Sequence, residues 1–161
     1  MNHKPKERVM TKNKILKIGL DVHGVSNEVP EFFAELAKTL IAAGHEVHVL
    51  SGPPIAQIKE ELSKLQIPYT HLFSIVDFHK ERGTPMHQDS KGNWHLSGKY
   101  GGWWWDRTKG DYCLKNHVSL MLDDSDRYGY FFTTPYARFY SKDKRKHHID
   151  EDESGNKNEI S

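Results

Sequence analysis

The sequence predicts an α/β protein: a single Rossmann-like three-layer domain on a mostly parallel, five-stranded sheet. Two observations predict this class. Short apolar runs typical of buried strands alternate with segments whose apolar residues recur at helical spacing. The helical segments are also long enough to carry the chain between parallel strands by right-handed crossovers. The length of 161 residues suits one such domain.

The expected elements have recognisable ends. Pro30 is tolerated in the first turn of the first helix, and Gly44 ends that helix. Gly52 and the two prolines after it open the second helix. In chain order we expect a strand at 15–20, a helix at 29–43, a strand at 46–51, a helix from 52–54 to 65, a strand at 69–78, a short helix at 111–116, and strands at 118–123 and 136–140.

A change of pattern between about residues 80 and 106 predicts an insertion after the third strand. Residues 89–93 are rich in turn-forming side chains, and short segments at 85–88 and 94–96 flank them. We therefore expect the insertion to be a small hairpin.

Both ends of the chain differ in composition from its middle. Residues 1–13 are polar and basic, and residues 142–161 are almost entirely charged or polar. We expect a flexible N-terminal segment and a charged, disordered tail on either side of a domain at 14–141. The net charge of +1 gives no overall field that would recruit nucleic acid or a membrane. The basic block at 142–146 leaves a nucleic-acid-binding arm as an alternative.

The sequence favours a cytoplasmic protein outside the membrane. Its single cysteine, Cys113, excludes an internal disulfide and fits a reducing compartment. The N-terminus lacks the apolar stretch of a signal peptide. No window approaches the roughly 20 apolar residues of a membrane-spanning helix.

Acidic residues follow two of the expected strands. Asp21 comes directly after the first strand, and Asp123 and Asp124 end the strand at 118–123. The carboxyl ends of parallel strands share one edge of a sheet, where open α/β sheets place their sites. Carboxylate oxygens are the hard ligands that Mg²⁺ requires. These residues therefore predict a magnesium site at this edge.

Three further residues at the same edge suit phosphoryl transfer. Ser51 ends the second strand and can donate a hydrogen bond to a phosphate oxygen. Gly52 precedes a helix, whose free N–H groups favour an anion. Lys109, just before the helix at 111–116, can offset the charge of a transferring phosphoryl group. Lys115 is the alternative for this last role, and the sequence leaves both open.

The order of these residues resembles the haloacid dehalogenase-like (HAD) hydrolase superfamily. The usual first motif, Asp-x-Asp followed by Gly, is matched by residues 21–25, and the second, an apolar strand ending in Ser or Thr, by 47–51. Lys109 best matches the lone lysine, and residues 120–124 match the apolar strand that ends in paired acids. The resemblance covers roughly residues 15–140 and implies a small Mg²⁺-dependent phosphatase that forms an aspartyl-phosphate.

The resemblance also implies a role for each matching residue. Asp21 becomes the nucleophile and a metal ligand, Asp124 the other carboxylate on Mg²⁺, and Asp123 its support. The backbone carbonyl of His23 is a further implied metal ligand. The residues implied to act on the substrate are Ser51, Gly52 and Lys109.

His23 departs from the family pattern. In the family's phosphatases the second Asp of the first motif protonates the leaving group and later activates water, and His23 stands at that position. An imidazole can do the same proton work. The alternatives are a catalytically degenerate domain that binds a phosphate or a partner, and a nucleic-acid end phosphatase that uses the basic block as an arm.

Three consecutive tryptophans, at 103–105, bear on the substrate. Consecutive aromatic residues cannot all face one side of a helix or strand, so we expect at least one to be exposed or to lie over the site entrance. Packing within the insertion and stacking on a flat substrate are the two interpretations. Together with a short insertion that leaves the site open, the run favours a small phosphorylated substrate, in particular a nucleotide.

Overall fold

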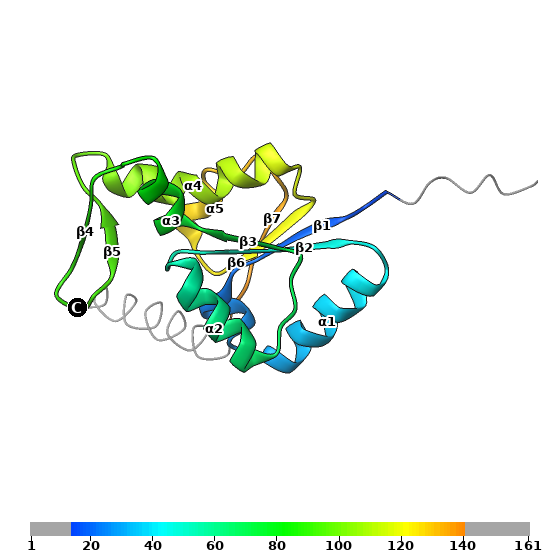
Figure 1. Cartoon of the computed structure of the whole chain (residues 1–161). Helices are drawn as coiled ribbons and strands as arrows, with labels where there is room; N and C mark the ends of the chain where they lie inside the picture. The colour runs from blue at the N-terminus through cyan, green and yellow to red at the C-terminus, as the bar shows by residue number, and fades with distance from the viewer. Residues whose placement is uncertain (1–13, 141–161) are drawn as a thin grey trace, which may run out of the picture.

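The structure, a computed structural model, describes residues 14–140 and has a five-stranded sheet at its centre. The strands lie in the order β3-β2-β1-β6-β7, and all neighbours in this order pair in parallel. The predicted α/β class is therefore confirmed (Figure 1). The strands of this sheet are β1 (Lys17–Leu20), β2 (Glu46–Ser51), β3 (His71–Ser74), β6 (Leu120–Asp123) and β7 (Tyr136–Arg138).

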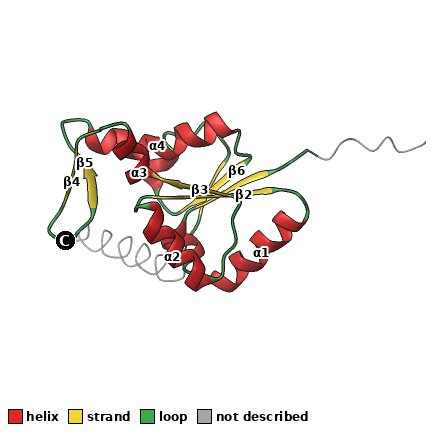
Figure 2. Cartoon of the chain, in the orientation of Figure 1, coloured by secondary structure: helices red, strands yellow, loops and turns green. Residues whose placement is uncertain are grey.

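Helices cover both faces of the sheet (Figure 2). They are α1 (Pro30–Ala42), α2 (Ile55–Leu65), α3 (Ile75–Glu81), α4 (Gly101–Asn116) and the short α5 (Asp126–Gly129), with a π-helical turn, η1, at Val22–Ser26. The segments predicted to be flexible or disordered, 1–13 and 142–161, lie outside the described residues, as does the basic block.

The strand β2 shows why two layers of helix are needed. Its residues Val47 and Val49 are buried in one apolar cluster with Phe33 of α1. The residue after Val49, Leu50, belongs to a second cluster with Cys113 of α4. Because successive strand residues point to opposite faces, one apolar strand requires cover on both sides.

The third strand is shorter than predicted. The apolar run predicts a strand at 69–78, but β3 ends at Ser74 and α3 begins at the next residue. Ser74 caps this helix, because its hydroxyl accepts a hydrogen bond from the backbone N–H of Asp77 (3.0 Å). A serine three residues before an acid is a helix-start signal. The apolar run at 69–78 does not distinguish the strand from the helix start, because buried strands and buried helices both give continuous apolar stretches.

The helix before β6 is longer than predicted. It is expected at 111–116, but α4 begins at Gly101, so the tryptophans lie in a helix and not in the insertion. Gly101 allows α4 to approach the hairpin backbone closely, since a Cβ at this position would lie 2.0 Å from the carbonyl oxygen of Leu96. The helix buries the polar residues Thr108 and Lys109, which removes the apolar periodicity that would have predicted it.

The hairpin is present, within a shorter insertion than the predicted 80–106. Its strands are β4 (Met86–Gln88) and β5 (Trp94–Leu96), and they pair antiparallel. Asp89 closes the turn, because its Oδ1 accepts hydrogen bonds from the backbone N–H groups of Lys91 and Asn93 (both 2.9 Å). The insertion is shorter because helices α3 and α4 extend into both of its ends.

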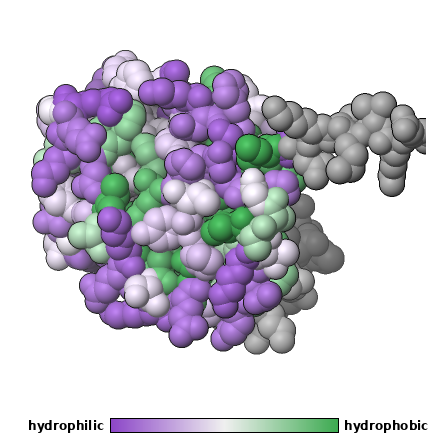
Figure 3. All heavy atoms as spheres, turned by 45° about the vertical axis from the view of Figure 1, so that its right-hand side comes forward, coloured by the Kyte–Doolittle hydropathy of each residue, from purple (hydrophilic) through white to green (hydrophobic). Residues whose placement is uncertain are grey.

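Within residues 14–140, no helix combines the length and the apolar character needed to cross a membrane. On the face shown in Figure 3, hydrophobic residues lie in small groups among hydrophilic ones. Trp103 and Trp104 are about half exposed, at 44% and 50%. Their exposure agrees with the expectation that the three tryptophans cannot all be buried together.

Replacing Gly101 by Ala is expected to destabilise the domain by about 1–3 kcal/mol, because the added methyl group forces α4 away from the hairpin. Gly102 is the matched control. A Cβ there meets nothing within 4 Å, and alanine favours a helix over glycine by about 1 kcal/mol. Gly102→Ala should therefore leave stability unchanged or raise it. Urea denaturation of both variants checks this, and equal effects at the two positions would contradict the close approach.

Candidate active site

The carboxyl ends of β1 and β6 place two aspartates side by side. Leu20 pairs with Leu122, and the N–H of Asp21 donates to the carbonyl of Leu122 (3.0 Å). Asp21 therefore lies at the level of Asp123 in the neighbouring strand. Both are buried, at 6% and 0% exposed. The two acidic strand ends meet at one sheet edge, as the parallel topology requires.

Lys109 lies between these two carboxylates and is itself only 2% exposed. Its Nζ is 3.0 Å from Asp21 Oδ1 and 2.7 Å from Asp123 Oδ2. Burial acts to lower the pKa of this amine, but attraction to the two carboxylates outweighs it and holds the pKa above its usual value. The side chain therefore stays protonated. Lys109 comes from the middle of α4, and the alternative, Lys115, is exposed and lines a different cavity.

The charge on Asp21 is costly even beside the Lys109 ammonium. Burial raises the pKa of Asp21, attraction to Lys109 opposes the shift, and repulsion from Asp123 adds to it. The backbone N–H of Val22 donates to Asp21 Oδ1 (2.8 Å), which holds the carboxylate in place. A divalent cation bound here would favour the ionised form and relieve this cost.

Three aspartates lie close enough together to hold a metal ion. Asp21, Asp123 and Asp124 each offer a carboxylate oxygen, and these atoms lie within 4.8 Å of one another. Both oxygens of Asp123 are engaged, by Lys109 (2.7 Å) and by the backbone N–H of Ser125 (3.0 Å). Asp21 and Asp124 line an open depression whereas Asp123 does not, so they are better placed as ligands, with Asp123 as their support. Hard oxygen donors in this number suit Mg²⁺; the ion, and the His23 carbonyl as its ligand, stay predictions.

His23 links Ser51 to a residue that sequence analysis missed. Its Nδ1 is 3.3 Å from Ser51 Oγ, and its Nε2 is 2.8 Å from Glu61 Oε2. Gly24, at φ 77°, turns the chain immediately after the histidine. Glu61 comes from α2 and has no local signal, since it is one of two adjacent glutamates on an amphipathic helix. Only the packing of α2 beside the first motif identifies it.

Gly52 reaches the site, but not as the start of a helix. It was expected to present a free helix N-terminus to an anion, and α2 begins three residues later, at Ile55. The N–H of Ile55 already donates to Asp77 Oδ2 (2.7 Å). The two prolines that follow Gly52 keep the chain extended and delay the helix, with Pro54 at ψ 147°.

Most of the predicted site residues line one open depression of about 500 Å³. Asp21 and Asp124 line it, and the fully buried Asp123 does not. Arg127, which the sequence did not single out as a site residue, stands at its rim with a side chain that is 73% exposed. The remaining predicted residues that line it are His23, Ser51, Gly52 and Lys109.

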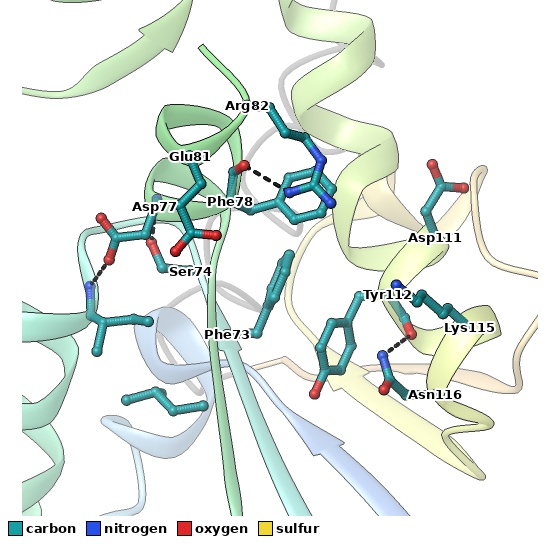
Figure 4. Close-up of a pocket in the computed structure, with 12 residues that line it drawn as sticks. Phe73, Ser74, Asp77, Phe78, Glu81, Arg82, Asp111, Tyr112, Lys115 and Asn116 are labelled. Carbon is teal, nitrogen blue, oxygen red and sulfur yellow. Dashed lines mark hydrogen bonds between the residues drawn. The ribbon is translucent and has the colours of Figure 1, made fainter. Parts of the chain in front are cut away.

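A second cavity, of about 430 Å³, lies between α3 and α4 and shares no residue with this depression (Figure 4). Phe73 and Tyr112 form an aromatic wall, with ring centroids 4.4 Å apart. Lys115 stands near Asp111 at one side of the cavity in Figure 4. No pair of carboxylates shares a buried lysine here, so the chemistry is expected at the depression and not in this cavity.

Comparisons with known proteins give no family assignment. No protein-family model matches the chain, and neither a curated protein nor a solved structure matches it. The functional interpretation therefore rests on the chain's own residues and on the geometry that brings them together.

Proposed function

We propose that this protein is a Mg²⁺-dependent phosphomonoester hydrolase of the HAD-like type that acts through an aspartyl-phosphate on Asp21. One observation carries the proposal: the carboxylates of Asp21 and Asp124 and the protonated Lys109 converge on one open depression. Burying charged carboxylates and a lysine costs desolvation free energy, so such a cluster is better explained by a function than by stability. A cytoplasmic setting, which the single cysteine favours, is part of the same proposal.

Asp21 supplies the nucleophile in this mechanism. One of its oxygens attacks phosphorus, the ester P–O bond breaks, and the leaving oxygen takes a proton from the His23 imidazolium. Water then gives a proton to His23 and attacks the aspartyl-phosphate, which releases inorganic phosphate and restores the carboxylate. When bound, Mg²⁺ would neutralise charge on the phosphate. Lys109 adds a fixed positive charge beside the reacting group.

Glu61 orients the ring of His23, which lines the depression. The Glu61 carboxylate, 2.8 Å from Nε2, stabilises the imidazolium and fixes the ring, so that Nδ1 faces Ser51. A carboxylate that orients a histidine in this way is a recurring arrangement in hydrolases. Ser51 is fully buried, which suits a hydrogen-bonding role better than that of a nucleophile.

The His23→Ala variant is expected to lose about 10²–10⁴-fold in kcat, the usual contribution of a general acid–base. Glu61→Gln should lose less, because the imidazole remains and only the carboxylate that orients its ring is removed. Steady-state rates of both variants measure these losses. Glu60, also on α2 but paired with Lys64, provides the matched control Glu60→Gln, which should keep the wild-type rate.

The degenerate-domain alternative rests on the same departure at position 23. His23→Asp separates this alternative from the proposed function: a loss of activity means that the imidazole is catalytic, and a large gain means that the natural site is degenerate.

The proposed function itself is tested by measuring phosphate release from a panel of phosphomonoesters with Mg²⁺ or with EDTA. Release that requires Mg²⁺ supports the proposal, and no release from any ester near neutral pH would overturn it.

A further inference from the structure

A smaller depression opens directly beside the one that contains the carboxylates. It measures about 400 Å³ and shares the lining residues Gly52 and Pro53 with its neighbour, so the two are adjacent. Trp105 of α4 and Trp94 of the hairpin line it, and we call it the tryptophan depression. A group joined to a phosphate bound at Asp21 can therefore reach the tryptophan depression by passing over Gly52 and Pro53.

Trp105 is held firmly in this wall. Its indole N–H donates to the hydroxyl of Tyr128 (3.0 Å). Its ring lies against Gly52, because a Cβ added there would be 3.1 Å from the ring. Trp105 also precedes Lys109 by four residues on α4, so both side chains lie on the same helix face. One helix therefore supplies the phosphate-side lysine and an aromatic ring beside it.

Another part of the wall comes from the hairpin, which projects beyond the sheet next to α3 and α4 (Figure 1). Beside Trp94, this wall carries Lys91 and Asn93. A lysine ammonium donates hydrogen bonds, and an asparagine amide both donates and accepts them. Asn93 Nδ2 already donates to Asp89 Oδ2 (3.0 Å). A depression lined by two indole rings and by these polar groups suits a flat ring that has polar atoms on its edge.

We propose that the tryptophan depression binds the base of a nucleoside monophosphate whose phosphate is bound at Asp21. The phosphate half of this assignment rests on the proposed function. Of the three tryptophans, Trp105 is the one that lines the depression, and Trp103 and Trp104 do not. Stacking accepts any base, because every base has a π-face, so selectivity among the four bases should be small.

The test compares a nucleoside monophosphate, AMP, with an aliphatic ester, glycerol 3-phosphate. The measured quantity is the ratio of their kcat/KM values. Wild type should favour AMP, and Trp105→Leu should lower the ratio by about 10–100-fold, the effect of losing one base stack. Trp94→Leu, on the hairpin and away from the carboxylates, should lower it in the same direction. Trp104→Leu is the matched control, and its ratio should equal that of wild type.

A wild-type ratio near one, or a ratio that neither Trp105→Leu nor Trp94→Leu changes, would overturn the proposal. Titration calorimetry with adenosine, which has no phosphate, separates this failure from that of the proposed function. Adenosine that binds wild type and binds Trp105→Leu at least about tenfold more weakly supports the depression even if no ester is hydrolysed. Adenosine that does not bind wild type overturns it even if phosphate release is observed.

Discussion

Asp21→Asn is expected to abolish phosphate release, with a loss on the order of 10⁴–10⁶-fold, as for removal of other catalytic nucleophiles. The amide has nearly the same shape, and its oxygen can still accept the hydrogen bond from Val22 that Asp21 Oδ1 accepts (2.8 Å). It cannot, however, form an acyl-phosphate. Burial already disfavours the charged carboxylate and raises the pKa of Asp21, and Lys109 keeps its ion pair with Asp123 (2.7 Å). A neutral side chain at position 21 should therefore weaken the fold less than the loss of Lys109 does.

Asp106→Asn is the matched control for this experiment. Asp106 lies on α4 and does not line the depression. Burial raises its pKa, as it does that of Asp21. Asp106→Asn should keep wild-type rates. Phosphate release and thermal unfolding are measured on all three proteins with Mg²⁺ present. An Asp21→Asn variant that is folded and retains more than a tenth of the activity would contradict the role of Asp21.

Lys109→Met is expected to affect both stability and activity. Its removal leaves Asp21 and Asp123 buried without a counter-charge, which typically costs about 3–5 kcal/mol. Loss of the charge beside the reacting group should lower kcat by about 10²–10³-fold. If the aspartates bind Mg²⁺, the ion replaces part of the missing charge. Mg²⁺ should therefore stabilise Lys109→Met more than it stabilises wild type.

Urea denaturation with and without Mg²⁺ measures this difference, and Lys115→Met is the matched control. Lys115 is an exposed lysine on the same helix, so its loss should leave stability within about 0.5 kcal/mol of wild type. Equal destabilisation by the two variants would contradict the ion pairs of Lys109. Equal effects of Mg²⁺ on Lys109→Met and wild type would contradict a metal site at these aspartates.

The sequence was sufficient for the sheet and for the residues at its carboxyl edge. Apolar runs identify the strands that build the core, and an acid directly after such a run must lie at the strand end whatever the loops do. Asp21 and Asp123 could therefore be placed side by side once the sheet was taken to be parallel. The register of Leu20 with Leu122 gives the same result from the structure.

The rest depended on packing between segments that are distant in sequence. The role of Gly101 could not be predicted, because the carbonyl of Leu96, which it approaches, belongs to the hairpin. Glu61 resembled any exposed acid of an amphipathic helix until α2 was placed against His23. Trp105 could not be separated from its two neighbours, because the face that each tryptophan takes depends on where α4 begins.

Trapping of the covalent intermediate tests the central claim most directly. Wild type is mixed with excess phosphomonoester and Mg²⁺, quenched in acid, digested and analysed by mass spectrometry. We predict one phosphoryl group on the peptide that contains Asp21, released by hydroxylamine as an acyl-phosphate is, and absent from Asp21→Asn. Phosphate release with the phosphoryl group on another residue, or with no phosphorylated protein at any quench time, would contradict the account.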